Sequence, residues 1–303
     1  MIFGISALVF VGLTWTVVGV VMGLAPKRGI DVSAVQFASA GIAISVSIVV
    51  LFFMPESTCT IKVYSLTGAS FFLYGFLNFM MLQIMAFSMQ RGPNGIIWGI
   101  IQSAVIFPFF AGIIFFNVAL TPIRLAGMLL LLGALAIFGL CREKSNFSGK
   151  SWKLVTFLNF LLCGLVITVS NLPSYYPAAE TVSSVSRTMF TSIGIFTGAI
   201  IYNLYRREKE KWKMLFLNFK TVTLWKFVGI LQGFSLLAGY FFFYNGMNAL
   251  ANAGAGSIAY PLLTGASIIG FSFYSMFFLK EKSTVPQYLA LTACAAGIVC
   301  ISL

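Results

Sequence analysis

The sequence predicts an all-α polytopic membrane protein of ten transmembrane helices, arranged as two inverted five-helix repeats. Three observations carry this prediction. Of the 303 residues, 59% are hydrophobic and only 9% are charged, whereas soluble domains carry roughly 25% charged residues. The apolar residues form ten segments, each near the ~20 residues that cross a bilayer as a helix. The basic residues stand almost entirely in every second gap between these segments.

The ten segments are located by their apolar length and by the polar gaps that separate them. No positive region precedes the first segment, because Lys27 and Arg28 follow it. We therefore expect a retained first helix rather than a cleaved signal peptide. The predicted ranges are 2–24, 33–54, 65–89, 93–116, 122–140, 153–172, 179–205, 222–246, 254–278 and 284–302.

The distribution of basic residues predicts the topology. All but three of the 19 Lys and Arg residues lie in or beside gaps that follow odd-numbered segments; the exceptions are Lys62, Arg124 and Arg187. Cytoplasmic loops are enriched in Lys and Arg, so we expect these gaps in the cytoplasm. Both termini should then lie outside a cytoplasmic membrane. Because topology accounts for the net charge of +12, we expect no nucleic-acid partner.

A polar gap at 141–151 divides the chain into five segments plus five. The expected organisation is a first half over 1–141, a cytoplasmic linker over 142–152 and a second half over 153–303. Because five is an odd number, two equivalent halves would be inserted upside down relative to each other. That arrangement is common in secondary transporters.

The composition argues against an enzyme and against a metal protein. The chain has no His, seven acidic residues and five Cys, and no two Cys have CxxC spacing. General acid–base catalysis and metal binding both need clusters of such residues. We therefore expect no catalytic residue, no metal and no cofactor. The lack of a long polar region also disfavours a membrane scaffold or sensor, which is kept as the non-transport alternative.

One segment holds charges of both signs. Glu180 and Arg187 lie seven residues apart in the seventh segment, which would place them on one helix face about 10 Å apart. Glu180 is a candidate proton-coupling group, or else a solvated acid at a helix start, favoured by the helix dipole. Arg187 is a candidate substrate-binding residue, because charged groups deep in a membrane usually face the bundle interior.

Uncharged polar and aromatic residues supply the other candidates. Trp15 and Asn78 lie in the first and third segments. Asn94, Trp98 and Gln102 are spaced i, i+4 and i+8 and share one face of the fourth segment. Amide and indole groups in such a row suit a hydroxylated or zwitterionic ligand. Interhelical hydrogen bonding is the alternative interpretation.

Aromatic residues near the end of the eighth segment and in the ninth complete the set. Tyr244 is either a binding residue or a member of an interfacial aromatic belt. Tyr260 lies deeper, beside Pro261, and shares a helix face with Thr264. We expect a pocket or gate role for Tyr260.

Ten short-loop segments in a five-plus-five arrangement resemble the drug/metabolite transporter superfamily. The most specific residues are Leu279-Lys280-Glu281-Lys282 at the end of the ninth segment, after Tyr260-Pro261. The first half departs from the pattern, because Pro108 is displaced and no acid follows the fourth segment. Most ten-span members keep their termini in the cytoplasm. The outward termini, together with Ala25-Pro26-Lys27-Arg28 and the Phe241–Tyr244 run, are similar to the sugar-uptake branch, such as the L-rhamnose–proton symporter family.

The resemblance implies a central pocket lined by segments 1, 3, 4, 6, 8 and 9, and alternating access by rocking of the two halves. The expected function is secondary transport of a small polar metabolite, with a sugar or polyol as the leading substrate and proton coupling as an option. The transport alternative is export of amino acids or amphipathic compounds. The expected partners are a small-molecule substrate, the lipid bilayer and, as an open option, a second copy in a homodimer.

Overall fold

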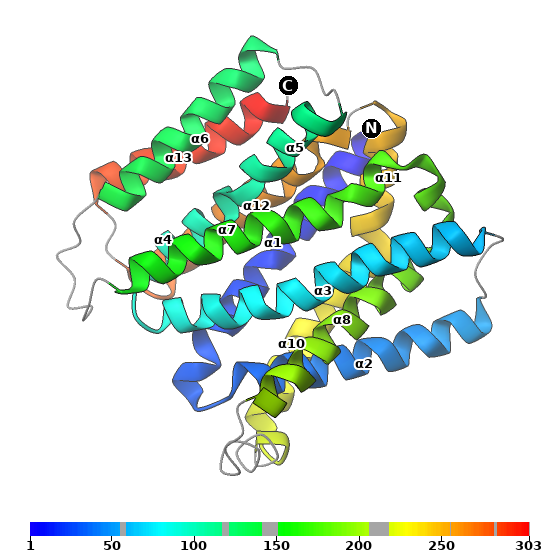
Figure 1. Ribbon diagram of the computed structural model, residues 1–303. Coiled ribbons are helices and arrows are strands. Elements are labelled where there is room, and N and C mark those ends of the chain that lie inside the picture. Colours follow the sequence, from blue (N-terminus) through cyan, green and yellow to red (C-terminus); the bar gives the residue numbers. More distant parts are fainter. Residues whose placement is uncertain are drawn as a thin grey trace.

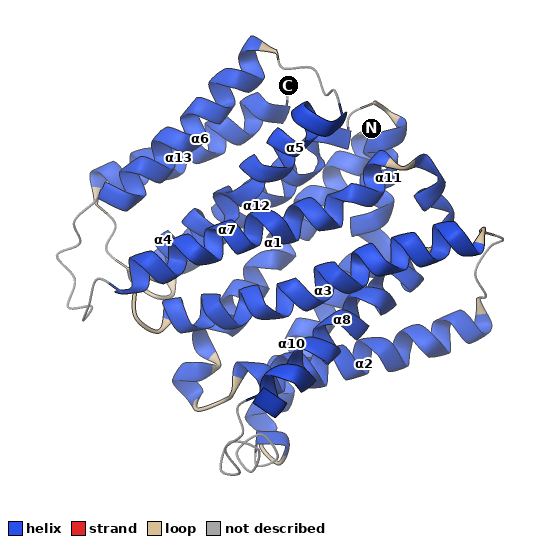
Figure 2. Ribbon diagram, in the orientation of Figure 1, coloured by secondary structure: helices blue, strands red, loops and turns tan. Residues whose placement is uncertain are grey.

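Helices occupy all ten predicted segments in the computed structural model (Figures 1 and 2). The structure describes residues 1–54, 59–116, 121–140, 151–205, 218–254, 256–281 and 284–302, and within these ranges no residue lies in a strand. The helices are α1 (Ile2–Leu24), α2 (Val32–Phe53), α3 (Ile61–Met89), α4 (Asn94–Gln102), α5 (Ile106–Phe116), α6 (Pro122–Leu140), α7 (Ser151–Asn171), α8 (Ser184–Tyr205), α10 (Val222–Leu237), α11 (Tyr244–Asn252), α12 (Ala259–Phe277) and α13 (Val285–Ser302).

Two of the predicted segments are irregular inside. The fourth consists of α4, the 3-10 turn η2 (Ser103–Val105) and α5, and the eighth consists of α10, the π-helix η5 (Ala238–Phe243) and α11. Most of the predicted linker lies outside the described residues, and so do the basic residues Arg142, Lys144, Lys150, Arg206–Lys213 and Lys282.

Seven helical stretches are long and apolar enough to cross a membrane, judged on the described residues by length and composition. They are α1, α2, α3, α4 with α5, α7, α8, and α10 through α11. Two of the other helices contain shorter apolar stretches, Pro122–Ala134 in α6 and Tyr288–Gly297 in α13. Large side chains such as Phe52, Phe277 and Leu129 are exposed on the outside of the bundle. The chain is therefore an all-α multi-pass membrane protein.

Short polar side chains start several of these helices. The Asp31 carboxylate accepts a hydrogen bond from the Ser33 amide at 2.8 Å at the start of α2. The hydroxyls of Thr60, Thr121 and Thr221 accept from the amide three residues further on, at the starts of α3, α6 and α10. Such caps satisfy amides that have no partner within the helix. The sequence thus marks where several helices begin.

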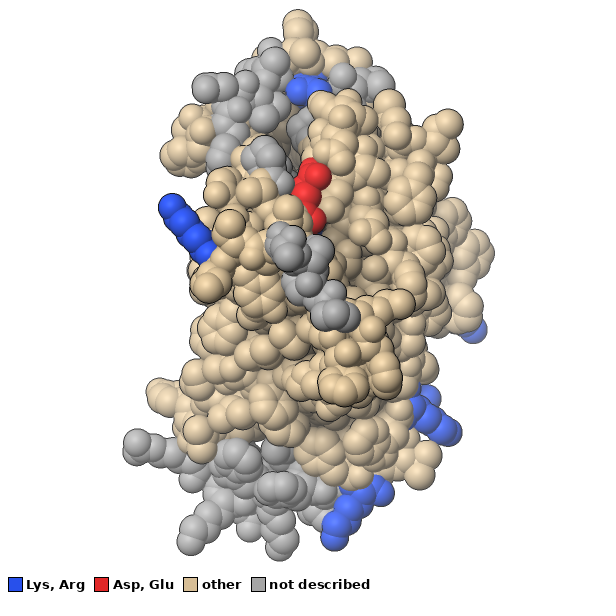
Figure 3. All heavy atoms as spheres, turned by 90° about the vertical axis from the view of Figure 1, so that its right-hand side faces the viewer, with Lys and Arg blue, Asp and Glu red and all other residues tan. Residues whose placement is uncertain are grey.

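The helices run alternately up and down, so every second connection lies at the same end of the bundle (Figure 1). We call the end where α1 stops and α4 begins the basic end, because Lys27, Arg28, Arg91, Lys220 and Lys280 lie there. The opposite, far end carries both chain termini. The face of the bundle drawn in Figure 3 is mainly uncharged, and among the described residues it carries only scattered Lys, Arg and acidic side chains.

Close backbone contact joins α3 to α8. A Cβ added to Gly75 would overlap the backbone carbonyl of Thr191, and one added to Gly194 would overlap the carbonyl of Phe72. Small residues allow membrane helices to pack at such short range. Elsewhere α1 packs on α12, α2 on both α8 and α10, α7 on both α3 and α4, and α6 on α13. These contacts leave a space between α1, α3 and α10, which holds the candidate site.

Candidate substrate-binding site

A central cavity lies inside the bundle, with about 220 Å³ open to the centres of water molecules. Residues of α1, α3, α4, α7, α10, α11 and α12 line it, as the predicted pocket between segments 1, 3, 4, 6, 8 and 9 requires. Residues of α2 and α8 also line it, in addition to the predicted segments. Water needs only about 10–15 Å³ of such space per molecule, so the cavity has room for a small solute.

The cavity wall is mainly apolar, and the polar groups among its described lining residues are uncharged. No Asp, Glu, Lys or Arg is among its described lining residues. Four carboxamides, Gln36, Asn78, Gln102 and Gln232, line it together with serine, threonine and tyrosine hydroxyls and the rings of Trp15, Trp98 and Phe243. Such a wall offers hydrogen bonds and apolar ring faces to a ligand but no ion pair.

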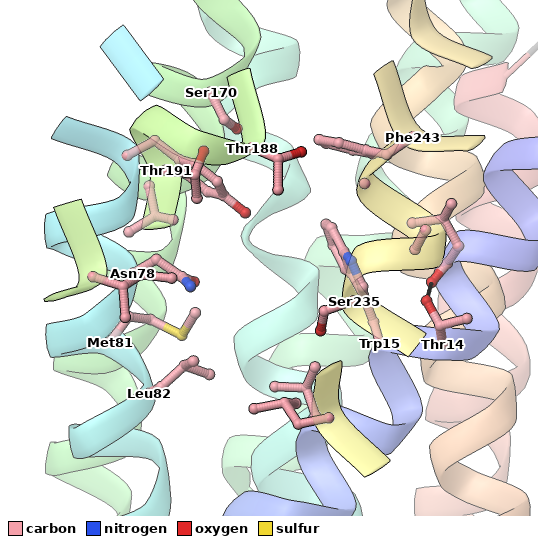
Figure 4. A pocket seen from close by; sticks show the side chains of 18 of the residues that line it. Thr14, Trp15, Asn78, Met81, Leu82, Ser170, Thr188, Thr191, Ser235 and Phe243 are labelled. Atoms are coloured by element: carbon pink, nitrogen blue, oxygen red, sulfur yellow. Dashed lines mark hydrogen bonds between the residues drawn. The ribbon is translucent and has the colours of Figure 1, made fainter. Parts of the chain in front are cut away.

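Two walls face each other across the cavity (Figure 4). Asn78, Met81 and Leu82 project from α3 on one side, and Trp15 projects from α1 on the other. The Trp15 ring lies 6.2 Å from that of Phe243, measured between centroids. An amide and an indole on opposite walls could bind a hydroxylated ring between them, the amide by hydrogen bonds and the indole by stacking.

A polar cluster lies on α2 and α10. The Gln232 side-chain nitrogen donates to the backbone carbonyl of Ser39 at 2.6 Å. Gln36 is only 2% exposed, and neither its nitrogen nor its oxygen has a hydrogen-bond partner. The Ser39 hydroxyl and the Gln232 oxygen also lack partners. All three residues line the cavity, so their unpaired polar atoms lie in its wall.

Hydroxyls and rings gather towards the far end of the cavity. Tyr260 is hydrogen-bonded to Ser170 of α7 and lies edge-on to Phe243. The Tyr244 hydroxyl lies 3.4 Å from that of Thr191. Tyr244 is 3% exposed. It therefore belongs to the cavity wall and not to an interfacial belt.

The irregular helices place several of these groups. Ala238, Gly239 and Phe243 of the π-helix η5, and Tyr244 directly after it, line the cavity. Gln102 lines it just before the 3-10 turn η2, which precedes Pro108 in α5. π-helical turns occur often at functional sites, and interrupted helices often form transporter binding sites.

Arg187 lies behind this wall and does not line the cavity. Its guanidinium donates to the backbone carbonyls of Val182 and Ala179, at 3.0 and 2.7 Å, and to the Asn248 side chain at 3.3 Å. It also lies 5.5 Å from the Tyr244 ring centroid, within range of a cation–π interaction. Arg187 thus holds the loop before α8 and supports Tyr244.

The predicted geometry of Glu180 and Arg187 is wrong. Glu180 is exposed in a separate 3-10 turn, η4 (Pro177–Thr181), and Val182 is extended with ψ 123°. The helix starts only at Ser184, after the Ser183 hydroxyl accepts the Ser186 amide at 3.2 Å. Since the chain leaves the helix between them, Glu180 and Arg187 share no helix face. Arg187 lies in the first turn of α8.

The row on α4 is divided between two places. Trp98 and Gln102 line the cavity, and the Trp98 nitrogen donates to the Ser267 carbonyl at 3.2 Å. Asn94 lies at the basic end, outside the cavity lining. Eight residues of helix span about 12 Å, so one face can extend beyond the site. Thr264 also lies outside the lining and donates to the carbonyl of Tyr260 at 2.9 Å.

Glu281 closes the basic end between the two predicted halves. Its two carboxylate oxygens accept the backbone amides of Asn94 and Gly95, both at 2.9 Å. Glu281 follows α12, whereas these amides begin α4, 187 residues earlier in the chain. A carboxylate at a helix N-terminus is stabilised by the free amides and the helix dipole. This bidentate contact is named the Glu281 latch below.

Among the described residues, no group of three His, Cys, Asp or Glu residues could hold a metal ion. No known family model matches the chain, and no curated protein matches it. One solved structure, described only as the crystal structure of a protein, aligns with 97% of this chain and 96% of its own at a TM-score of 0.63 and 11% sequence identity. The fold is therefore similar to that of a protein solved before, and this likeness indicates no function.

Proposed function

We propose that this protein is a secondary carrier of a small, uncharged, hydroxylated solute, with a sugar or polyol as the leading substrate. The observation that carries the proposal is the central cavity, whose wall offers amides, hydroxyls and aromatic rings without a charged group. Buried polar groups inside an apolar bundle are costly unless they serve a function such as binding a solute. Neutral hydrogen-bonding groups combined with ring faces suit a sugar.

The proposal includes ten membrane crossings in two inverted halves. It pairs α1 with α7, α2 with α8, α3 with α10–α11, α4–α5 with α12, and α6 with α13. The contact of α3 with α8 then corresponds to that of α10 with α2, and the contact of α1 with α12 to that of α7 with α4. Exchanging the two halves leaves the α2–α8 contact and the α6–α13 contact unchanged, because each joins a helix to its own counterpart. This match supports an inverted repeat and membership of the drug/metabolite transporter superfamily.

In this proposal the basic end faces the cytoplasm and both termini lie outside the cytoplasmic membrane. The described basic residues Lys27, Arg28, Arg91 and Lys280 lie at one end, and the positive-inside rule places that end in the cytoplasm. A reporter fused to the C-terminus tests the orientation. Activity of a reporter that works only in the cytoplasm would contradict it.

Alternating access requires the halves to separate at one end at a time. The Glu281 latch joins α4 of the first half to the chain after α12 of the second. Opening the cavity to the cytoplasm would therefore break this latch. The two hydrogen bonds would re-form when the cavity closes at that end.

The placement of the acids supports uniport or exchange over proton symport. Glu180 is exposed outside the helices, and no described carboxylate lines the cavity. An amino acid substrate is also less well served, because its ammonium and carboxylate groups would meet no charged partner. Acid–base catalysis would need a positioned titratable side chain, and the proposal accordingly assigns no enzyme activity.

Counterflow uptake into proteoliposomes tests the proposal. The panel contains sugars, polyols, amino acids and nucleosides, each with and without an imposed pH gradient. We expect saturable uptake of an uncharged hydroxylated solute, lost in Trp98→Ala. Gly233→Ala is the control, because an added Cβ there meets no neighbour within 4 Å. Lack of flux of every solute through correctly inserted protein would contradict the proposal.

A further inference from the structure

We infer that Gln36, Ser39 and Gln232 form the hydroxyl-recognition site of the cavity, which binds adjacent hydroxyl groups of an uncharged ligand. The inference rests on the proposed function and assigns it a specific set of ligand contacts on α2 and α10. These residues are called the carboxamide site below. None of them stands out in the sequence as a member of a motif.

The carboxamide site has unfilled hydrogen-bonding capacity. Both polar side-chain atoms of Gln36, the Ser39 hydroxyl and the Gln232 oxygen are buried without a partner. Buried polar atoms in folded proteins nearly always have one, because leaving one unpaired costs about 1–3 kcal/mol. Gln36 and Ser39 are only 2% and 4% exposed, and both line the cavity. A ligand in the cavity would supply the missing partners.

Burial without a partner is not enough to make a site, and other residues of this chain illustrate that. Gln83 has an unpaired buried nitrogen, and Asn159 has two unpaired buried atoms. Neither residue lines the central cavity. The carboxamide site differs because its three residues all line the central cavity and occur together.

The unpaired atoms also differ in the kind of hydrogen bond that each can make. The Gln36 nitrogen can only donate and its oxygen can only accept, and the free Gln232 oxygen can only accept. A ligand hydroxyl both donates and accepts, so two neighbouring hydroxyls can satisfy all three atoms. A carboxylate would leave the two amide oxygens without a donor, and an ammonium would leave the Gln36 nitrogen without an acceptor. The site therefore selects hydroxyl groups over either ion.

Contacts between neighbouring helices hold the carboxamide site in place. The Gln232 nitrogen holds the Ser39 carbonyl at 2.6 Å. The hydroxyls of Ser47 in α2 and Tyr240 in η5, which follows α10, lie 2.7 Å apart. These contacts fix α2 relative to α10 before a ligand arrives. Pre-organised groups lose little entropy on binding, so the site can discriminate between similar solutes.

The test combines glutamine variants with deoxy analogues of the transported solute. KM for uptake into proteoliposomes is measured for wild type, Gln36→Met, Gln232→Met and the control Gln83→Met. Met keeps the length of the side chain but removes its amide. We expect KM to rise tenfold or more in the first two variants, as the loss of a buried hydrogen bond predicts. We expect the Gln83→Met variant to stay within about twofold of wild type.

The deoxy analogues test direct contact and need only wild-type protein if a variant does not insert. At least one analogue that lacks a single hydroxyl should bind the wild-type protein about tenfold more weakly than the parent solute does. The Gln36→Met variant should bind that analogue and the parent solute with equal affinity. Such non-additivity is expected when two groups touch. If wild type transports a solute but no deoxy analogue loses affinity, or both variants keep wild-type KM, the inference is overturned while the proposed function stands.

A binding readout separates failure of transport from failure of recognition. Cys163 lines the cavity, so a bound solute should slow its reaction with a maleimide in a protein whose other cysteines are replaced. Protection by a sugar or polyol without flux, lost in Gln36→Met, would support the carboxamide site and overturn the carrier proposal. Lack of both flux and protection by every hydroxylated solute would overturn both.

Discussion

Replacing Glu281 by Gln should open the cavity at the basic end. In the Glu281 latch, one carboxylate accepts two backbone amides at 2.9 Å. Hydrogen bonds to charged groups contribute about 1.5–3 kcal/mol each, and half-burial of Glu281 favours the lower value. Gln keeps one accepting oxygen but turns an NH2 group towards the second amide. The expected loss is therefore about 2 kcal/mol, which corresponds to about a 30-fold shift between the closed and open states.

The assay is the labelling rate of Cys163 by an impermeant maleimide, in a protein with no other cysteine. Inverted and right-side-out vesicles present the two ends of the bundle separately. The rate from the basic end should rise by up to about 30-fold in Glu281→Gln and should stay unchanged in the control Glu180→Gln, an exposed acid at the far end. An unchanged rate from the basic end, or an equal rise from both ends, would refute the idea that the latch governs one gate.

Three further predictions concern single substitutions. Gly75→Ala should lower the melting temperature, because its Cβ would overlap the Thr191 carbonyl and overpacking costs about 1–3 kcal/mol. The control Gly233→Ala places its Cβ in open space and should leave the melting temperature unchanged. Arg187→Met should destabilise the protein and weaken substrate binding, because two backbone carbonyls lose their donor. An unchanged KM and melting temperature would contradict the supporting role of Arg187. Glu180→Gln should transport at the wild-type rate with the same response to an imposed pH gradient, and loss of uptake would make Glu180 a coupling residue after all.

Much of the helix arrangement could be predicted from the sequence, because the bilayer sets helix length and basic gaps set direction. The ten predicted ranges all contain helices, and most ends agree within a few residues. The start of α8 could not be predicted well. Val182 and Ser183 are compatible with a helix by composition, but the serine cap and the Arg187 contacts separate α8 from the preceding turn.

The candidate site was accessible to sequence reasoning only in part. Trp15, Asn78, Trp98 and Tyr260 lie on the cavity wall, and their role in binding stays a prediction. Gln36 was missed because a single Gln in an apolar helix carries no local signal. Its importance depends on which helix packs against α2, and the Gln232–Ser39 contact joins α2 to a helix 193 residues later in the chain.

The Glu281 latch also has a consequence for biogenesis. The Asn94 and Gly95 amides find their acceptor only when the chain after α12 arrives. Until the ribosome has made most of the protein, the start of α4 must remain bonded to water or lipid headgroups. The first five-segment half therefore cannot reach its final structure alone, although it is complete in sequence. Separately expressed halves should acquire the native fold only when they are made together.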